Sequence, residues 1–201
     1  MLINSHTIEK KGGIMTTTKA NYDTLIVKDP VLFTQYLTSY IALINSSVED
    51  NSILGFIKPI SNDNYNVYIE NIKYELKNNS LELIFIFDDH KLIGTVSLKY
   101  FRGSSKSHIC EIHKGIIKKE NRGINVLKKI FQAIEIQALK NNISKIILDV
   151  RENSRAHKMW KYIGFTEYGK LLDYSRIDNM TYSGCFMEIS LDALSKFTRR
   201  K

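Results

Sequence analysis

The segment from Ser107 to Val150 constrains the fold more than any other, because three patterns follow one another in it. SHICEIHKGII (107–117) alternates in polarity, as a strand with one buried face does. The helical period that follows runs to about Asn141. KIILDV (145–150) is almost continuously apolar, which is typical of a buried parallel strand. A strand, a helix and a strand in this order predict a right-handed parallel crossover.

The flanking segments extend this unit at both ends. A short strand is predicted at 24–28, a helix from Pro30 through Ile44, and a second helix after a cap at Asn62 or Asp63. The residues between these helices, 46–59, read as a loop. LELIFIFDD and KLIGTVSLKYF, beginning at 81 and 91, predict two strands joined by a tight turn at 88–90.

After the crossover, a short helix is expected over 154–162, with Gly164 as its C-cap. Two strands follow at about 166–177 and 180–191. The order β-α-α-β-β-β-α-β-α-β-β predicts one mixed α/β domain over residues 21–195. Residues 1–20 show no hydrophobic period and are expected to form a disordered extension. Lys-Gly-Gly before Met15 resembles a translated ribosome-binding site, so we expect Met15 to be the natural start.

The chain of 201 residues carries a formal net charge of +8. Such a charge favours an anionic partner, although a solvated lysine-rich surface would explain it equally well. The lysines are scattered, and no basic stripe with interleaved aromatic residues supports nucleic acid. The one compact basic cluster is Arg199-Arg200-Lys201. The longest apolar run, 31–44, is too short for a membrane span.

Cys110 and Cys185 lie far apart in the sequence and form no CxxC motif, so we expect two buried thiols in a reducing cytoplasm. The histidines show no ligand spacing relative to them, and no metal site is predicted.

The stretch KKENRGINVLKKIF (118–131) opens the helix of the crossover. The start of a helix offers unpaired backbone N–H groups and a positive dipole end, which together can bind a phosphate. Arg122, Lys128 and Lys129 add positive charge there. By itself, the stretch is either an anion site or an ordinary solvated helix start.

Two motifs connect this stretch with a known family. Residues 122–127, Arg-Gly-Ile-Asn-Val-Leu, correspond to a loop usually written RGxGxG, and NSRAHKMWKYIGF (153–165) corresponds to N-x-x-A-x-x-x-Y-x-x-x-GF. With the element order, they resemble the GCN5-related N-acetyltransferases, the GNAT superfamily. GFIKP (55–59), GTVSL (94–98), Glu111 and Asp149 are similar to the tabtoxin-resistance acetyltransferases within it. The resemblance implies a mostly antiparallel mixed sheet in which the fourth and fifth strands are parallel.

The resemblance also implies acetyl-CoA as cosubstrate. Its phosphates would bind at Arg122, Gly123, Ile124, Asn125, Val126, Leu127 and Lys128. A backbone N–H at Ile116 or Ile117 would polarise the thioester carbonyl, and Asn153 would bond the pantetheine arm or the strand gap that holds it. Asn125 and Leu127 replace small residues of the motif. Either crowding at Asn125 weakens binding, or the Asn125 side chain donates to a phosphate oxygen instead. Trp160 replaces the family's Tyr and carries no usable acid, and it packs against the pantetheine arm or in the core.

Acetyl transfer to an amine needs a base, because a free amine has a pKa of about 10. Glu111 and Asp149 are the candidates, and the family layout places them on adjacent strands. His113 is a third. Each of the three could instead be an ordinary polar strand residue.

We therefore expect direct transfer, in a ternary complex, of an acetyl group to a primary amine of a small molecule. The alternatives are a catalytically reduced acyl-CoA-binding module and an acetyltransferase that acts on protein or aminoacyl-tRNA. No membrane association is expected, and monomer and homodimer both remain open.

Overall fold

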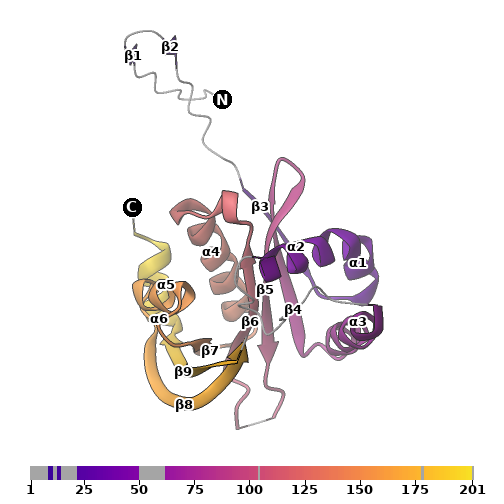
Figure 1. Ribbon diagram of the computed structural model, residues 1–201, viewed down its shortest axis with the longest axis vertical. Coiled ribbons are helices and arrows are strands. Elements are labelled where there is room, and N and C mark those ends of the chain that lie inside the picture. The colour runs from indigo at the N-terminus through magenta and orange to yellow at the C-terminus, as the bar shows by residue number, and fades with distance from the viewer. Residues whose placement is uncertain are drawn as a thin grey trace.

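The computed structural model describes residues 9–10, 13–14, 22–49, 62–103, 105–177 and 179–200. Its centre is a seven-stranded sheet with the order β3-β4-β5-β6-β7-β9-β8 (Figure 1). The strands are β3 (Asp23–Val27), β4 (Leu81–Asp88), β5 (Lys91–Tyr100), β6 (Ile109–Ile117), β7 (Lys145–Arg151), β8 (Thr166–Ile177) and β9 (Met180–Ser190). The pair β6–β7 is parallel and the other pairs are antiparallel. The predicted mixed sheet and its parallel crossover are confirmed.

The helices are α1 (Pro30–Gln35), α2 (Leu37–Glu49), α3 (Asn62–Lys77), α4 (Ile124–Lys140), α5 (Arg155–Ile163) and α6 (Leu191–Thr198). A 3-10 turn, η1 (Lys119–Asn121), precedes α4. Two paired two-residue strands, β1 (Glu9–Lys10) and β2 (Gly13–Ile14), form a separate small sheet. In the described part of the chain, no helix is both long and apolar enough to cross a membrane.

The helices differ from the sequence predictions in three respects. The first predicted helix is two helices, α1 and α2, because α1 ends with a C-cap at Tyr36. The second of them continues to Glu49, so the first part of the predicted loop is helical. Helix α6 was not predicted at all, although the Ser190 side chain accepts a bond from Ala193 N at 3.2 Å as its N-cap. Residues 55–59, which carried part of the subgroup resemblance, lie outside the described residues.

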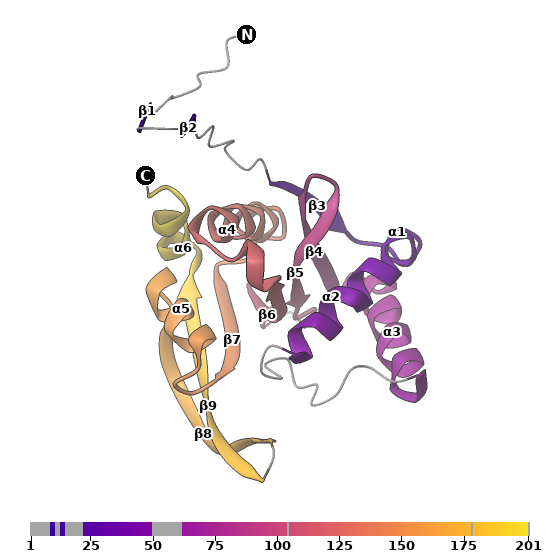
Figure 2. The same cartoon turned by 45° about the horizontal axis from the view of Figure 1, so that its top comes forward.

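The sheet separates two hydrophobic cores. Successive side chains of a strand point to opposite faces, so on β4 Leu83 and Phe85 pack with α1–α3, while Ile84 and Ile86 pack on the side of α4–α6. Figures 1 and 2 show the two groups of helices on opposite sides of the sheet. Because helices pack against both faces, the strands hold their side chains in fixed positions.

Strand β6 leaves β7 soon after the two strands meet. Their described register contains three pairs, from Ile109 with Lys145 to Glu111 with Ile147. Beyond this point β6 continues along β5 alone, with a register shift opposite Thr95–Ser97 and a positive φ of 47° at Lys114. An extra residue of this kind bends the strand that carries it. The far half of β6 thus has one edge without a strand partner in the described structure.

Candidate active site

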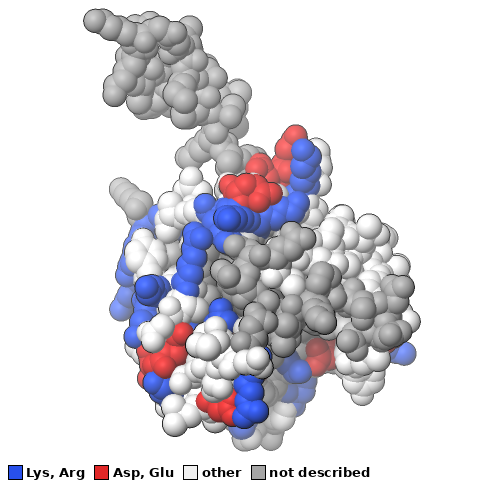
Figure 3. Space-filling view, viewed as in Figure 1, with Lys and Arg blue, Asp and Glu red and all other residues white. Residues whose placement is uncertain are grey.

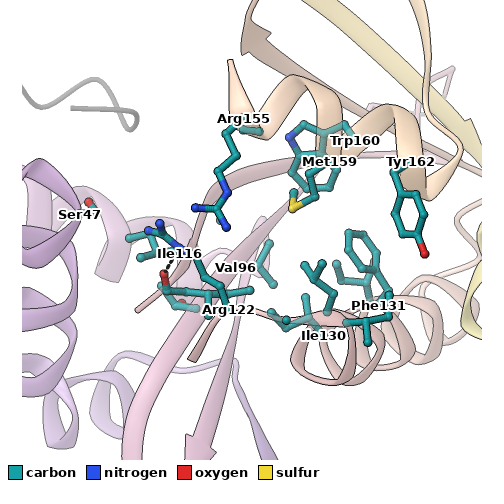
Figure 4. Close-up of a pocket in the computed structure, with 18 residues that line it drawn as sticks. Ser47, Val96, Ile116, Arg122, Ile130, Phe131, Arg155, Met159, Trp160 and Tyr162 are labelled. Carbon is teal, nitrogen blue, oxygen red and sulfur yellow. Dashed lines mark hydrogen bonds between the residues drawn. The ribbon is translucent and has the colours of Figure 1, made fainter. Parts of the chain in front are cut away.

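A cavity of about 440 Å³ lies along this free edge of β6, between the strand and helices α4 and α5 (Figure 4). Its walls are largely apolar. Ile116 and Ile117 contribute from β6, Leu127 and Phe131 from α4, and Met159 from α5. A mostly apolar cavity that also has charged groups in its lining suits a ligand with a slender chain and an anionic end.

Two arginines supply the charge. Arg122 precedes α4, and its Nε donates to the carbonyl oxygen of Ile117 at 3.1 Å. Arg155, the first residue of α5, extends over the cavity towards Arg122 (Figure 4). Arg155 forms no ion pair with any described residue. The sequence motif gave no signal for Arg155, because this position of the pattern accepts any residue.

The start of α4 lies at the same place. Its N-cap is Gly123, which lines the cavity and has no side chain to bond the first N–H groups of the helix. The N–H of Leu127 is already used, since it donates to the Gly123 carbonyl at 3.2 Å. Leu127 therefore contributes its side chain to the wall, while the open donors belong to residues 124–126. This geometry is that of an anion site at a helix N-terminus.

The other residues of the predicted loop lie differently. Ile124 lines the cavity, the side chain of Val126 is fully buried in the core, and Asn125 is exposed and outside the cavity lining. Lys128 points along the surface, where its Nζ donates to the carbonyl oxygen of Arg200 at 2.6 Å. Because Asn125 does not line the cavity, its side chain does not narrow the cavity itself.

The backbone of β6 presents alternate residues to the cavity. The carbonyl of Ile117 accepts the Arg122 bond, so this residue's backbone groups face away from β5. The carbonyl oxygen of Ile116 faces β5 instead, where a Cβ on Gly94 would stand 2.9 Å from it. Since the N–H and C=O of one strand residue point to the same side, the N–H of Ile117 faces the free edge. Sequence reasoning named Ile116 and Ile117 but not Gly115, which also lines the cavity.

Trp160 forms part of the wall. Its ring is only 9% exposed and makes edge contacts with Phe131 and Phe165, at centroid distances of 5.7 and 5.1 Å. Asn153 lies in the turn between β7 and α5 with a φ of 58°, outside the cavity lining, and its N–H donates to His157 Nδ1 at 3.1 Å. The indole is therefore a packed surface beside the cavity.

The candidate carboxylates lie on the opposite face of the sheet from α4 and α5. Glu111 pairs in register with Ile147, and Asp149 follows two residues later on the same face of β7. His113 Nε2 lies 3.0 Å from Glu111 Oε2. The contact with His113 lowers the pKa of Glu111, against the opposing effect of burial. Glu111 and Asp149 thus come together where β6 leaves β7.

A tyrosine that sequence reasoning missed holds Asp149. The hydroxyl of Tyr174, from β8, donates to Asp149 Oδ2. A register shift between Leu171 and Ser175 brings this ring over β9, where Gly184 makes room for it. A Cβ at Gly184 would stand 2.3 Å from Tyr174 Cγ. Burial, and then the bond to Asp149, raise the pKa of Tyr174, so the phenol keeps its proton.

Lys114, at the bend of β6, is a second residue missed by the sequence analysis. Burial lowers the pKa of its ammonium group, and the nearby Asp149 carboxylate opposes that shift. Neither Tyr174 nor Lys114 could be found from the sequence, because both owe their positions to irregular pairing in otherwise regular strands.

His157, Glu167 and Cys185 form a further cluster, with potential ligand atoms all within 4.8 Å of one another. The polar atoms of His157 and Glu167 already have partners within the protein. His157 Nε2 lies 2.9 Å from Glu167 Oε1, and Lys161 Nζ lies 2.6 Å from the same oxygen. Lys161, and then His157, lower the pKa of Glu167 to about 2. We interpret the cluster as a link between α5 and β8. Cys110 and Cys185 are both free and buried, as predicted.

The parallel pair of the sheet thus separates beside a helix start that has no side-chain cap, and such a helix start can bind an anionic group. Residues 58–165, more than half of the chain, match the model of the Acetyltransferase (GNAT) family. The chain belongs to this family of acetyltransferases. No match was found among curated proteins.

Solved structures agree with the fold. Spermidine N-acetyltransferase from Vibrio cholerae, in complex with CoA and spermine, is 20% identical with a TM-score of 0.67, over 87% of this chain and 98% of that one. Ribosomal-protein-alanine N-acetyltransferase from Brucella melitensis is 17% identical with a TM-score of 0.65, over 83% and 99%. A Salmonella typhimurium structure with its cofactor acetyl-CoA is 11% identical with a TM-score of 0.64, over 84% and 94%. At these identities the likeness concerns the fold.

The family uses acetyl-CoA, and the residues present fit it. The uncapped N–H groups at 124–126 suit its pyrophosphate, with Arg122 and Arg155 beside them. The apolar walls and the free edge of β6 suit a pantetheine arm. The predicted cosubstrate is therefore confirmed at the level of the family.

Proposed function

We propose that the chain transfers the acetyl group of acetyl-CoA directly to a primary amine of a small molecule, in a ternary complex in the cytoplasm. One observation carries the proposal. Helices α4 and α5 form much of the cavity wall, with Ser47 of α2 on its other side, and Glu111 and Asp149 lie on the face of the sheet opposite α4 and α5, where β6 and β7 stop pairing. Two substrates could then approach the same opening from the two faces.

Acetyl-CoA supplies an activated acetyl thioester, and the chain supplies orientation and polar groups. Residues 122–126 and Arg155 would hold the phosphates. The N–H of Ile117 would donate at the free edge of β6, to a pantetheine amide or to the thioester oxygen. Trp160 and Met159 exclude water from the arm.

Glu111 and Asp149 would interact with the acceptor amine. An amine with a pKa of about 10 arrives protonated near neutral pH and must lose its proton before it attacks. Glu111 and Asp149 would attract the cation and accept the proton, directly or through water. Tyr174 would hold Asp149 in one orientation, and His113 would do the same for Glu111.

Trp160 supports a second candidate function, a catalytically reduced acyl-CoA-binding module. An indole cannot protonate the departing thiolate. The nearby Tyr162 also lines the cavity, but it is 59% exposed and is not held beside the reacting group. A thiol has a pKa of about 8.5, however, so water can supply this proton. We therefore favour an active enzyme.

Thiol release from acetyl-CoA, measured with a panel of small amines, peptides and aminoacyl-tRNA, tests the proposal. A small primary amine should give the highest kcat/KM. Glu111→Ala and Asp149→Ala should lose most of the turnover but keep acetyl-CoA affinity near wild type. Binding without turnover on any acceptor would establish the reduced module. Equal loss of affinity and turnover in both variants would mean that the carboxylates are structural.

A further inference from the structure

Helix α6 is fixed against α4 by polar contacts at its C-terminal end. Ser195 Oγ and Thr198 Oγ1 each donate to a different carboxylate oxygen of Glu135, both at 2.5 Å. Arg199 Nη2 lies 3.8 Å from the same carboxylate. Figure 2 shows α6 beside α4. The last described turn of the chain therefore has a defined position on the helix that begins at the cofactor cavity.

The end of this turn also reaches the second turn of α4. Lys128 Nζ donates to the Arg200 carbonyl oxygen at 2.6 Å. The guanidinium of Arg200 stands 5.9 Å from the ring centroid of Phe197, and that ring in turn contacts Tyr162 at 6.1 Å. Because Tyr162 lines the cavity, the contacts lead without a break from its wall to Arg200.

The turn is basic and accessible. The Arg199 side chain is 80% exposed, and Arg200 forms no ion pair with a described residue. With Lys128, they place three cations at the corner between α4 and α6. Figure 3 shows Lys and Arg side chains over the α4 and α6 side of the face in view. Glu135 is the acidic group that faces them from α4, and it is occupied by Ser195 and Thr198.

We propose that Arg200, with Lys128 and Arg199, binds the ribose phosphate of coenzyme A. This inference rests on the proposed function. The pyrophosphate and the ribose phosphate belong to the same nucleotide, so a second cationic site beside the uncapped start of α4 is what the cofactor requires. A guanidinium can bond a phosphate through two N–H groups, and stacking on Phe197 holds its plane.

Calorimetric titration with CoA and with 3′-dephospho-CoA tests this. The wild-type chain should bind CoA about tenfold more tightly than the dephospho form, since a charge-assisted contact is lost. Arg200→Ala should remove most of that difference by weakening CoA alone. Arg200→Lys should keep part of it. Arg102→Ala is the matched control, because Arg102 is also an exposed arginine stacked on a ring, 5.1 Å from that of Tyr100, and it should leave both affinities unchanged.

The outcomes distinguish failure of the ribose-phosphate site from failure of the proposed function. Equal binding of both ligands by the wild-type chain, or equal weakening of both by Arg200→Ala, would overturn the ribose-phosphate site and leave the proposed function standing. Binding of neither ligand by the wild-type chain would overturn both. Thermal melting of each variant checks that α6 remains docked.

Discussion

At the scale of single residues, Tyr174 and Asp149 form the contact on which the proposed chemistry depends most. The tyrosine comes from the outermost strand of the sheet, and it reaches Asp149 because β8 bulges and Gly184 leaves space under the ring. Asp149 gains a neutral donor, which holds a carboxylate in place without cancelling its charge. The phenol serves orientation better than acid catalysis, since burial raises its pKa.

Tyr174→Phe should lower kcat about tenfold, as expected when a carboxylate loses one hydrogen-bond donor. The affinity for acetyl-CoA should not change, because Tyr174 does not line the cavity. Steady-state kinetics and calorimetry measure the two effects. Tyr182→Phe, on the neighbouring strand, is the control and should behave as wild type. An unchanged kcat in Tyr174→Phe would show that Asp149 needs no positioning.

Glu167→Gln should change the pH dependence of stability. Its folded pKa of about 2 lies below the value near 4.3 of an unperturbed glutamate. A depressed folded pKa stabilises the fold above the unfolded value, and the contribution is lost as the pH falls towards 2. Melting at pH 6, 4 and 3 should show a gap between wild type and variant that narrows with falling pH. A constant gap would mean that the carboxylate charge is not responsible.

The sequence motifs located the helix start and one wall of the cavity. Arg122 and Gly123 lie at the helix start beside the cavity, and Trp160 lies in its wall, while their roles in cofactor binding stay predictions. It failed for Arg155, Lys114 and Tyr174. The spacing of apolar residues does not reveal the strand irregularities that place Lys114 and Tyr174. It also does not show that the Arg155 side chain turns towards the cavity.

At the scale of elements, the contact between β5 and β6 determines the shape of the cavity. Gly94 lets the two strands approach where β6 bends, since any Cβ there would meet the Ile116 carbonyl at 2.9 Å. The next residue, Ile117, bonds Arg122 and lines the cavity. A shift of β6 would therefore move a strand edge that we assign to the cofactor.

Gly94→Ala should destabilise the fold by about 1–3 kcal/mol, the usual cost of overpacking. It should also weaken acetyl-CoA binding, because β6 must move away from β5. Denaturant unfolding and calorimetry measure the two effects. Gly169→Ala is the control, since a Cβ there would stand 3.6 Å from Phe186 Cδ2, an ordinary contact. Equal stability of the two variants would contradict the close approach at Gly94.

Most elements were predictable because periodicity and turn chemistry agree in them. The turn after β4 is one example, with positive φ at Asp89 and His90 as in a two-residue hairpin turn. Gly164, with φ of 119°, ends α5 as expected. The break at Tyr36 and helix α6 were missed. Apolar spacing alone reveals neither the C-cap at Tyr36 nor the contacts that hold α6 on Glu135 of α4.

At the scale of the whole molecule, the two faces of the sheet carry different parts of the candidate site. Helices α4 and α5 form much of the cavity wall, with Ser47 of α2 on its other side, and the face opposite α4 and α5 carries Glu111 and Asp149. The net charge of +8 fits an anionic cofactor, and Arg122, Arg155 and Lys128 are among the positive groups near the start of α4. The carboxylates of Glu111 and Asp149 would suit the cationic amine that we propose as the acceptor.

The most direct test of the account is calorimetric titration of acetyl-CoA into the wild-type chain and into Arg155→Ala. Arg155 lines the cavity and forms no ion pair with a described residue, so its removal leaves the Arg122 bond to β6 in place. We predict saturable one-to-one binding by the wild-type chain, weakened about tenfold in the variant. The absence of saturable binding to the wild-type chain would contradict the assignment of this cavity to acetyl-CoA.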